Sequence, residues 1–279
     1  MAIDLKVAQR PETVDVVSLD PARPALLFRI GHYPLHHGTL GAVRSLGRAG
    51  VPVYAMTEGR WTPVARSSYL SGYLVSRLTG AEEPSEVLRT LVKLGREVGE
   101  RAILIPTDDE AAVFAAEHAE QLEPFFVLPQ VPPDLPRRLA SKRGLVDVCR
   151  KFDIPTPLTV GASCLAEVKC AADRMRFPLI IKNAEPWTRL TNPTVSKNTV
   201  GADAAVLSSL AGHWREPFSI IMQEYIPADL SQDWIVHAYA GADAASSIIF
   251  TGVKVRSWPV EAVTKAATVH LDPGGTASP

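Results

Sequence analysis

Short apolar runs and longer amphipathic segments alternate through the first half of the chain. Three runs have the length and aliphatic content of buried strands, and they lie at 25–30, 51–56 and 102–106. The segments that follow them repeat apolar residues three or four positions apart, as one face of a helix requires, and they lie at 39–49, 84–98 and 107–121. This order predicts an open parallel sheet flanked by helices.

Local signals indicate where several helices begin and end. Gly50 ends the first helix, and the capping-box spacing from Thr107 to Glu110 starts the third, with Thr107 as the capping residue. Ser141 is expected to cap a later helix whose apolar stripe runs from Leu145 to Phe152.

Strands dominate the second half, which follows a segment rich in proline. Four prolines fall within 129–136, and this density predicts an extended linker and a domain boundary. A helix is expected at 163–175, and strands are expected at 178–182, 218–225, 234–240 and 247–255. A turn at 241–243 would join the last two strands as a hairpin, so this half is predicted to be α+β with an antiparallel sheet.

The expected organisation is an N-terminal arm at 1–23, a Rossmann-like α/β domain at 24–135 and a second domain at 136–279. A chain of 279 residues, 46% of them hydrophobic, has ample material for these cores. Its 29 Lys and Arg residues nearly balance 30 Asp and Glu residues, which disfavours binding to nucleic acid or to an anionic membrane.

The start of the chain lacks the apolar core of a signal peptide, and no apolar run approaches the roughly 20 residues that span a bilayer. The three cysteines, Cys149, Cys164 and Cys170, have no metal-binding spacing and are expected to be reduced thiols that pack as small core residues. These features predict a cytoplasmic protein.

Candidate chemistry begins with two apolar runs that end in charged residues. Lys182 closes the run that begins at Phe177, and Glu224 follows a run about forty residues later, shortly before Pro227. Lys142 lies in the first turn of the helix after Ser141, where exposed N–H groups favour anions, so two lysines could hold an α- and a β-phosphate. The proline ends its strand and leaves nearby main chain free to pair with an adenine edge. Taken one at a time, Lys182 is also expected as a solvated strand end, Lys142 as a surface residue and the segment 223–227 as an exposed edge strand.

Four short segments resemble successive landmarks of the ATP-grasp superfamily, in particular the carbamoyl-phosphate-synthase-like carboxylate–amine ligases. They are Ser141-Lys142-Arg143, Pro178-Leu179-Ile180-Ile181-Lys182, Gln223-Glu224-Tyr225-Ile226-Pro227 and Gln232-Asp233-Trp234. The resemblance covers residues 24 to 279. It implies a Rossmann-like leading domain followed by a partial nucleotide-clasping domain with an antiparallel sheet.

The resemblance also implies roles for individual residues. Lys142 and Lys182 would contact ATP phosphates, Asp229 or Asp233 would lie near the ribose, and the adenine would be flanked by Gln223, Glu224, Tyr225 and Ile226. Lys254 and Arg256 would face the γ-phosphate or an acyl-phosphate, and alternate strand residues do share a face. The implied reaction joins a small-molecule carboxylate to an amine with ATP and Mg²⁺, and the family resemblance allows a homodimer.

One departure from the family concerns the metal. After Lys254 the only acids are Glu261 and Asp272, and no Glu-x-Asn pattern is present, so the magnesium ligands are missing from this chain. We therefore expect that the chain is truncated at its C-terminus. Because phosphoryl transfer depends on metal ions that neutralise phosphate oxygens, we also expect weak nucleotide binding and little turnover. The alternative is a non-catalytic remnant that binds a nucleotide or a partner.

Two other enzyme classes fit less well. The glycines after the first strand, Gly31, Gly38 and Gly41, do not match the G-x-G-x-x-G of dinucleotide-dependent oxidoreductases, and no G-x-S-x-G elbow of a hydrolase exists. The histidines of the same loop, His32, His36 and His37, form either a plain polar loop or a substrate contact at the carboxyl edge of the sheet.

Overall fold

The structure is a computed structural model, and it describes residues 19–76, 78–187, 192–196, 199–227, 232–241, 247–254 and 269–271. The chain divides into two compact units, Met1–Arg137 and Arg138–Pro279. The expected N-terminal arm lies almost wholly outside the described residues. No helix among the described residues is long and apolar enough to span a membrane.

Unit 1 is built on a five-stranded parallel sheet, sheet A, with the strand order β3-β2-β1-β4-β5. Its strands are β1 Ala25–Phe28, β2 Val53–Thr57, β3 Gly72–Val75, β4 Ala102–Pro106 and β5 Phe126–Val127. Its helices are α1 His37–Arg48, α2 Pro84–Val98, α3 Asp109–Glu117 and α4 Ala119–Leu122. The predicted α/β class is confirmed.

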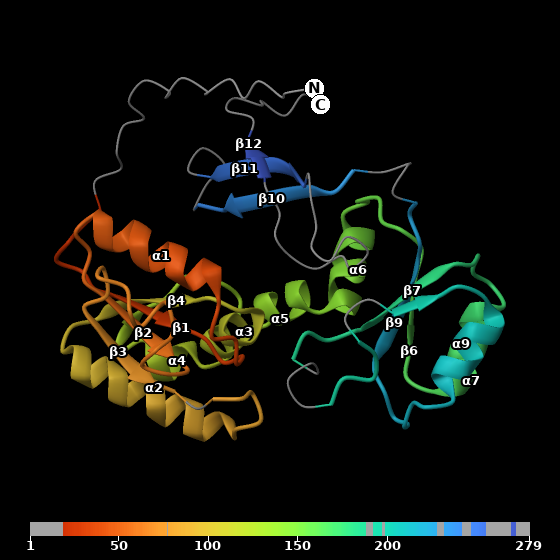
Figure 1. Ribbon diagram of the computed structural model, residues 1–279, viewed down its shortest axis with the longest axis horizontal. Helices are drawn as coiled ribbons and strands as arrows, with labels where there is room; N and C mark the ends of the chain where they lie inside the picture. Colours follow the sequence, from red (N-terminus) through yellow and green to blue (C-terminus); the bar gives the residue numbers. More distant parts are fainter. Residues whose placement is uncertain are drawn as a thin grey trace. The chain divides into compact units, whose positions relative to one another are not determined.

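Helices cover both faces of sheet A because the strands are apolar on both faces. Figure 1 shows α1 on one side of the strands and α2 on the other. Leu27 packs in a cluster with Val43 of α1, whereas the neighbouring Leu26 points to the opposite face. Each is 1% exposed, and burying a side chain of this size stabilises the fold by about 1.5–3 kcal/mol.

Unit 2 contains two antiparallel sheets. Sheet B has the order β6-β9-β7-β8, and sheet C has the order β10-β11-β12. The strands are β6 Thr159–Ala162, β7 Leu179–Asn183, β8 Thr199–Gly201, β9 Ile220–Glu224, β10 Trp234–Tyr239, β11 Ile248–Lys254 and β12 Val269–Leu271. The helices are α6 Lys142–Lys151, α7 Leu165–Ala172 and α9 Ala204–Ala211. The predicted antiparallel class is confirmed, and β10 pairs antiparallel with β11 as expected, while most of the turn predicted at 241–243 lies outside the described residues.

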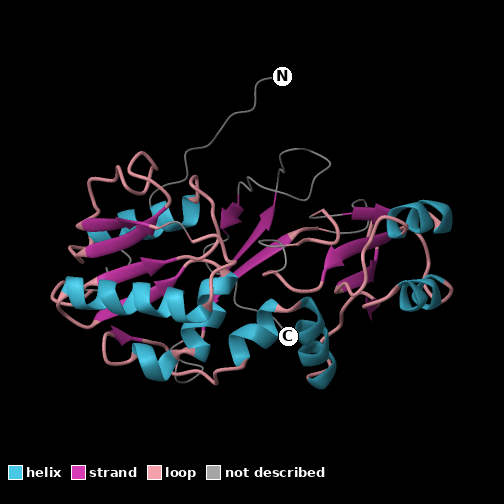
Figure 2. Ribbon diagram, turned by 90° about the horizontal axis from the view of Figure 1, so that it is seen from below, coloured by secondary structure: helices cyan, strands magenta, loops and turns pink. Residues whose placement is uncertain are grey.

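One face of sheet B carries the core of this unit. Both ribbon views show α7 and α9 on the same side of the sheet (Figures 1 and 2). The buried residues between sheet and helices come from the strands and from both helices: Ala162, Val168, Ala171, Leu179, Ile181, Leu207, Ala211, Ile220 and Met222. Alternate strand residues therefore project from the other face of the sheet, which α7 and α9 leave uncovered.

Several expectations about local structure were wrong. Asp108, and not Thr107, caps α3, because its carboxylate accepts from Ala111 N (2.9 Å) while the Thr107 hydroxyl is engaged with Phe28 O (3.3 Å) and Thr39. The proline-rich segment is not extended throughout, since α5 Leu135–Ala140 begins within it. Of the three free cysteines, only Cys149 is buried; Cys164 is partly buried and Cys170 is exposed.

Candidate functional site

The face of sheet B that α7 and α9 leave uncovered carries polar side chains from three strands. Gln223 of β9 lies opposite Ile180 of β7 and Thr159 of β6, and Lys182 lies opposite Ile221. Because residues opposite each other in a sheet share a face, Lys182, Gln223 and Thr159 project from the same side. We call this side the lysine face.

Lys182 is held on this face by a neutral partner. Its Nζ donates to Gln223 Oε1 at 3.0 Å, and the described residues include no carboxylate within ion-pair distance of it. Burial lowers the pKa of the Lys182 ammonium, and the charge of Lys142 lowers that pKa further. The two lysines predicted to hold phosphates are therefore close enough to act on each other.

The start of α6 is tied to the end of β7, and this contact explains why the two lysines meet. Ser141 caps the helix as predicted, since its Oγ accepts from Gly144 N at 3.1 Å. The same Oγ donates to Glu185 Oε1 at 3.0 Å, and Lys142 N donates to Ala184 O at 2.9 Å. A helix start thus lies beside the carboxyl end of the strand that carries Lys182.

Arg143 covers part of the lysine face. Its Nη2 donates to Ile220 O at 3.5 Å, and its guanidinium lies against Gly161. A Cβ at Gly161 would come within 2.8 Å of Arg143 Nε, so the guanidinium lies close against the main chain of β6. Arg143 belongs to a motif that the sequence singled out, but its contact with β6 was not foreseen because β6 itself was not predicted.

The end of β9 differs from the expected free edge. β9 lies between β6 and β7, Glu224 N donates to Leu158 O at 2.9 Å, and Glu224 Oε2 accepts from Leu158 N at 3.3 Å. The edge-strand reading is therefore wrong, and the Glu224 N–H is not free for a base. Glu224 follows Gln223 and so projects from the opposite face of the strand. Tyr225 and Ile226 lie beyond the strand and are exposed.

The remaining predicted site residues are placed only in part. Asp229 and Arg256 lie outside the described residues. Lys254 is the last residue of β11, and only its main chain is described. Asp233 is exposed and immediately precedes β10. Their expected roles at the ribose and the γ-phosphate stay predictions.

Unit 1 has a second polar cluster at the carboxyl edge of sheet A. Arg29 forms an ion pair with Glu58, and both side chains are buried. Glu58 Oε1 also accepts from Tyr33 N at 2.9 Å, and Asp108 Oδ2 accepts from Gly31 N at 2.7 Å. The two carboxylates thus fix the loop that follows β1.

Of the three loop histidines, only His36 is partly buried, and it caps α1 by accepting from Thr39 N at 3.1 Å. Burial lowers the pKa of His36, the charges of Arg29 and His37 lower it further, and Asp108 opposes them. His32 and His37 are exposed. The helix cap gives His36 a structural role that the sequence did not reveal.

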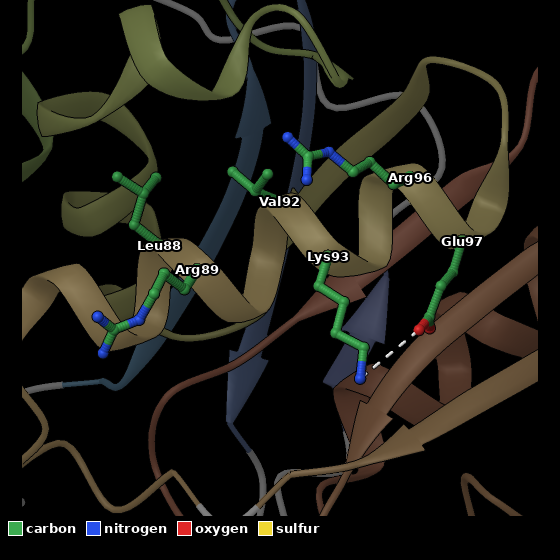
Figure 3. A pocket seen from close by; sticks show the side chains of 6 residues that line it. All are labelled: Leu88, Arg89, Val92, Lys93, Arg96 and Glu97. Atoms are coloured by element: carbon green, nitrogen blue, oxygen red, sulfur yellow. Dashed lines mark ion pairs between the residues drawn. The ribbon is translucent and has the colours of Figure 1, made fainter.

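A surface hollow on unit 1 contains none of the predicted site residues. Figure 3 shows its lining side chains, all from α2: Leu88, Arg89, Val92, Lys93, Arg96 and Glu97. Lys93 Nζ and Glu97 Oε1 lie 3.7 Å apart, and both side chains are exposed. An exposed pair one helical turn apart contributes about 0.3–0.5 kcal/mol, so this surface is a solvated helix side.

No group of three or more His, Cys, Asp or Glu side chains in the described ranges is arranged to hold a metal ion.

Comparisons with known proteins identify the fold. No protein-family model matches the chain. A D-aspartate ligase from Enterococcus faecium (strain Aus0004) is 23% identical over an alignment of 225 residues that covers 73% of this chain and 51% of that relative. The ADP complex of PurK, an N5-carboxyaminoimidazole ribonucleotide synthetase, matches with a TM-score of 0.61 at 13% identity, covering 86% of this chain and 56% of that one. An L-amino acid ligase from Bacillus licheniformis matches with a TM-score of 0.60 at 14% identity, covering 86% and 52%.

The chain spans about half the length of the relatives it matches, 51% of the D-aspartate ligase and 52–56% of the two structures. A parallel sheet in unit 1 followed by antiparallel sheets in unit 2 agrees with these matches. The chain therefore shares the fold of these solved structures over most of its length, in agreement with the α/β and antiparallel organisation that its motifs predicted.

Proposed function

We propose that the lysine face binds the polyphosphate of ATP and that the protein is an ATP-dependent carboxylate–amine ligase. One observation carries the proposal: Lys142 N bonds Ala184 O, two residues beyond Lys182, while the side-chain partner of Lys182 is a neutral glutamine. Two neighbouring cations repel each other, and an anion placed between them relieves that repulsion. A polyphosphate has the charge and the length to contact both.

The proposed reaction has two steps. A carboxylate oxygen of the substrate attacks the γ-phosphorus of ATP, so that an acyl-phosphate forms and ADP leaves. The nitrogen of the amine then attacks the acyl carbon, the bond to the phosphate oxygen breaks, and the nitrogen loses a proton to solvent. Lys142 and Lys182 would hold the phosphates of the departing ADP in both steps.

The proposal includes roles that the sequence motifs imply. Lys254 and Arg256 would stabilise charge on the transferring phosphoryl group, and the adenine and ribose would lie near Tyr225, Ile226 and Asp229 or Asp233. The substrates would be a small carboxylate and an amine, with Mg²⁺ accompanying ATP. The protein would act in the cytoplasm, without nucleic acid or membrane partners, and the resemblance allows a homodimer. The names of the matched ligases support the substrate class.

Isothermal titration of the full chain with ADP, with and without Mg²⁺, tests the binding site. We expect Lys182→Met to weaken ADP binding by about 10- to 100-fold, because a hydrogen bond to a charged group contributes about 1.5–3 kcal/mol. Lys169→Met is the matched control, since Lys169 is exposed on α7, which packs on the opposite face of sheet B. Equal affinity in Lys182→Met and the unaltered protein, or no binding of ADP, would overturn the proposal.

A second measurement separates a ligase from a non-catalytic nucleotide-binding protein of the same fold. The full chain is incubated with ATP, D-aspartate as a trial carboxylate and hydroxylamine as the amine, and the hydroxamate product is measured. A ligase releases phosphate and hydroxamate in equal amounts, because hydroxylamine intercepts the acyl-phosphate. Binding of ADP by Lys182 without either product would favour the non-catalytic alternative.

A further inference from the structure

The hydrogen bonds of Gln223 run in one direction across three strands. Its Oε1 accepts from Lys182 Nζ at 3.0 Å, and its Nε2 donates to Thr159 Oγ1 at 3.0 Å. Thr159 Oγ1 in turn donates to Pro157 O at 2.9 Å. An ammonium can only donate and a carbonyl can only accept, so the two ends of this chain fix every proton and the orientation of the amide.

The register of sheet B shows how the side chain of Lys182 reaches Gln223. Lys182 lies opposite Ile221, two residues before Gln223 on β9, so its side chain must lean diagonally across β9 to make the bond. Diagonal neighbours in a sheet lie about 7–8 Å apart at their Cα atoms, a span that a long lysine side chain covers easily. Gln223 is held from its far side by Thr159, directly opposite on β6.

The neutrality of Gln223 matters as much as its position. A carboxylate at this place would also hold the ammonium, but it would cancel its charge and repel phosphate oxygens. A neutral amide directs Lys182 and leaves its full charge available to an anion. An ordered side chain also loses less rotamer freedom when a ligand binds, which preserves affinity.

We propose that Gln223 is a positioning residue that holds Lys182 ready for the polyphosphate through the chain to Thr159 and Pro157, and that it does not itself contact the nucleotide. This inference rests on the proposed ATP site. It replaces the direct contact with adenine that the sequence motif implies for Gln223.

A double-mutant cycle on the full chain distinguishes the two roles. Gln223→Leu alone is expected to weaken ADP binding about tenfold, and in the Lys182→Met background it should change the affinity by less than about twofold. Thr159→Val, which removes only the far end of the chain, should give a smaller loss that also vanishes in that background. A loss from Gln223→Leu that persists without Lys182 would show direct contact with the nucleotide and overturn the inference.

A measurement without nucleotide tests the contact itself. The Lys182 ammonium is titrated by NMR in the unaltered protein and in Gln223→Glu, and the variant is expected to raise the pKa of Lys182 by placing a carboxylate beside it. An unchanged pKa would overturn the inference even if ADP binds. Failure of the unaltered protein to bind ADP would overturn the proposed function together with this inference, whereas a persistent loss in the double-mutant cycle would overturn this inference alone.

Discussion

The polar clusters described in unit 1 and unit 2 differ in the kind of partner that binds a positively charged side chain. At the carboxyl edge of sheet A, Arg29 is paired with Glu58, and that carboxylate also binds a main-chain N–H of the loop after β1. On the lysine face of sheet B, Lys182 is held by a neutral amide and lies near a second cation, Lys142. The first cluster uses its charges to build a loop. The second pairs the Lys182 ammonium with a neutral amide, which leaves the charge of Lys182 able to attract an anion.

The first test of this difference removes the carboxylate that pairs with Arg29 in unit 1. Glu58→Ala leaves the Arg29 guanidinium buried without its carboxylate, and breaking a buried ion pair costs about 3–5 kcal/mol. Hydrogen exchange of the β1 and β4 amides measures the loss within unit 1. Glu97→Ala, which removes an exposed partner of Lys93, should change the same exchange by less than about 0.5 kcal/mol. Similar losses in both variants would mean that the buried pair is not structural.

The second test compares two helix caps within unit 2. Ser141→Ala removes the cap of α6 and the bond to Glu185, and Asp203→Ala removes the cap of α9, where Asp203 Oδ1 accepts from Val206 N at 2.8 Å. Each should destabilise the unit by about 1–2 kcal/mol in urea unfolding. Only Ser141→Ala should also weaken ADP binding, because only α6 carries Lys142. An equal effect of both variants on ADP affinity would contradict a specific role for the start of α6.

The strongly aliphatic strands could be predicted because a strand that is buried on both faces, or at the centre of a sheet, appears in the sequence as a continuous run of apolar residues. β1, β4 and β9 lie within predicted runs, and β7 extends one residue beyond its run. Shorter elements were missed because pairing with distant segments, and not their own composition, stabilises them. β6 contains Thr159 and Gly161, β8 has three residues, and α9 is rich in alanine and serine without a clear apolar stripe.

The same reason limited the prediction of the site. The lysines were found because each ends or begins a recognisable element, and the structure brings them together. Two further contacts of the site were missed: Thr159, which accepts from Gln223, lies on a strand that was not predicted, and Glu185, which accepts from Ser141, lies in a turn with no periodic signal. The capping error at Thr107 has a related cause, since a bond to Phe28, far away in the sequence, engages that hydroxyl.

The smallest expected effect concerns the pH dependence of stability in unit 2. Because burial and Lys142 lower the pKa of Lys182 in the folded protein, the unfolded chain binds more protons between that lowered pKa and the usual value near 10.5. Stability should therefore rise with pH through this window, and the cost of the charged lysine should be fully present at lower pH. Lys182→Met removes that cost, so it should stabilise the protein at pH 7 by less than about 1 kcal/mol, since a half-buried ammonium stays partly hydrated.

The difference from the unaltered protein should shrink as the pH approaches 10.5 in urea unfolding, and Lys169→Met should show no such trend. Destabilisation by Lys182→Met at pH 7 would mean that the bond to Gln223 outweighs the uncompensated charge, and the contrast between the two clusters would then be one of geometry alone.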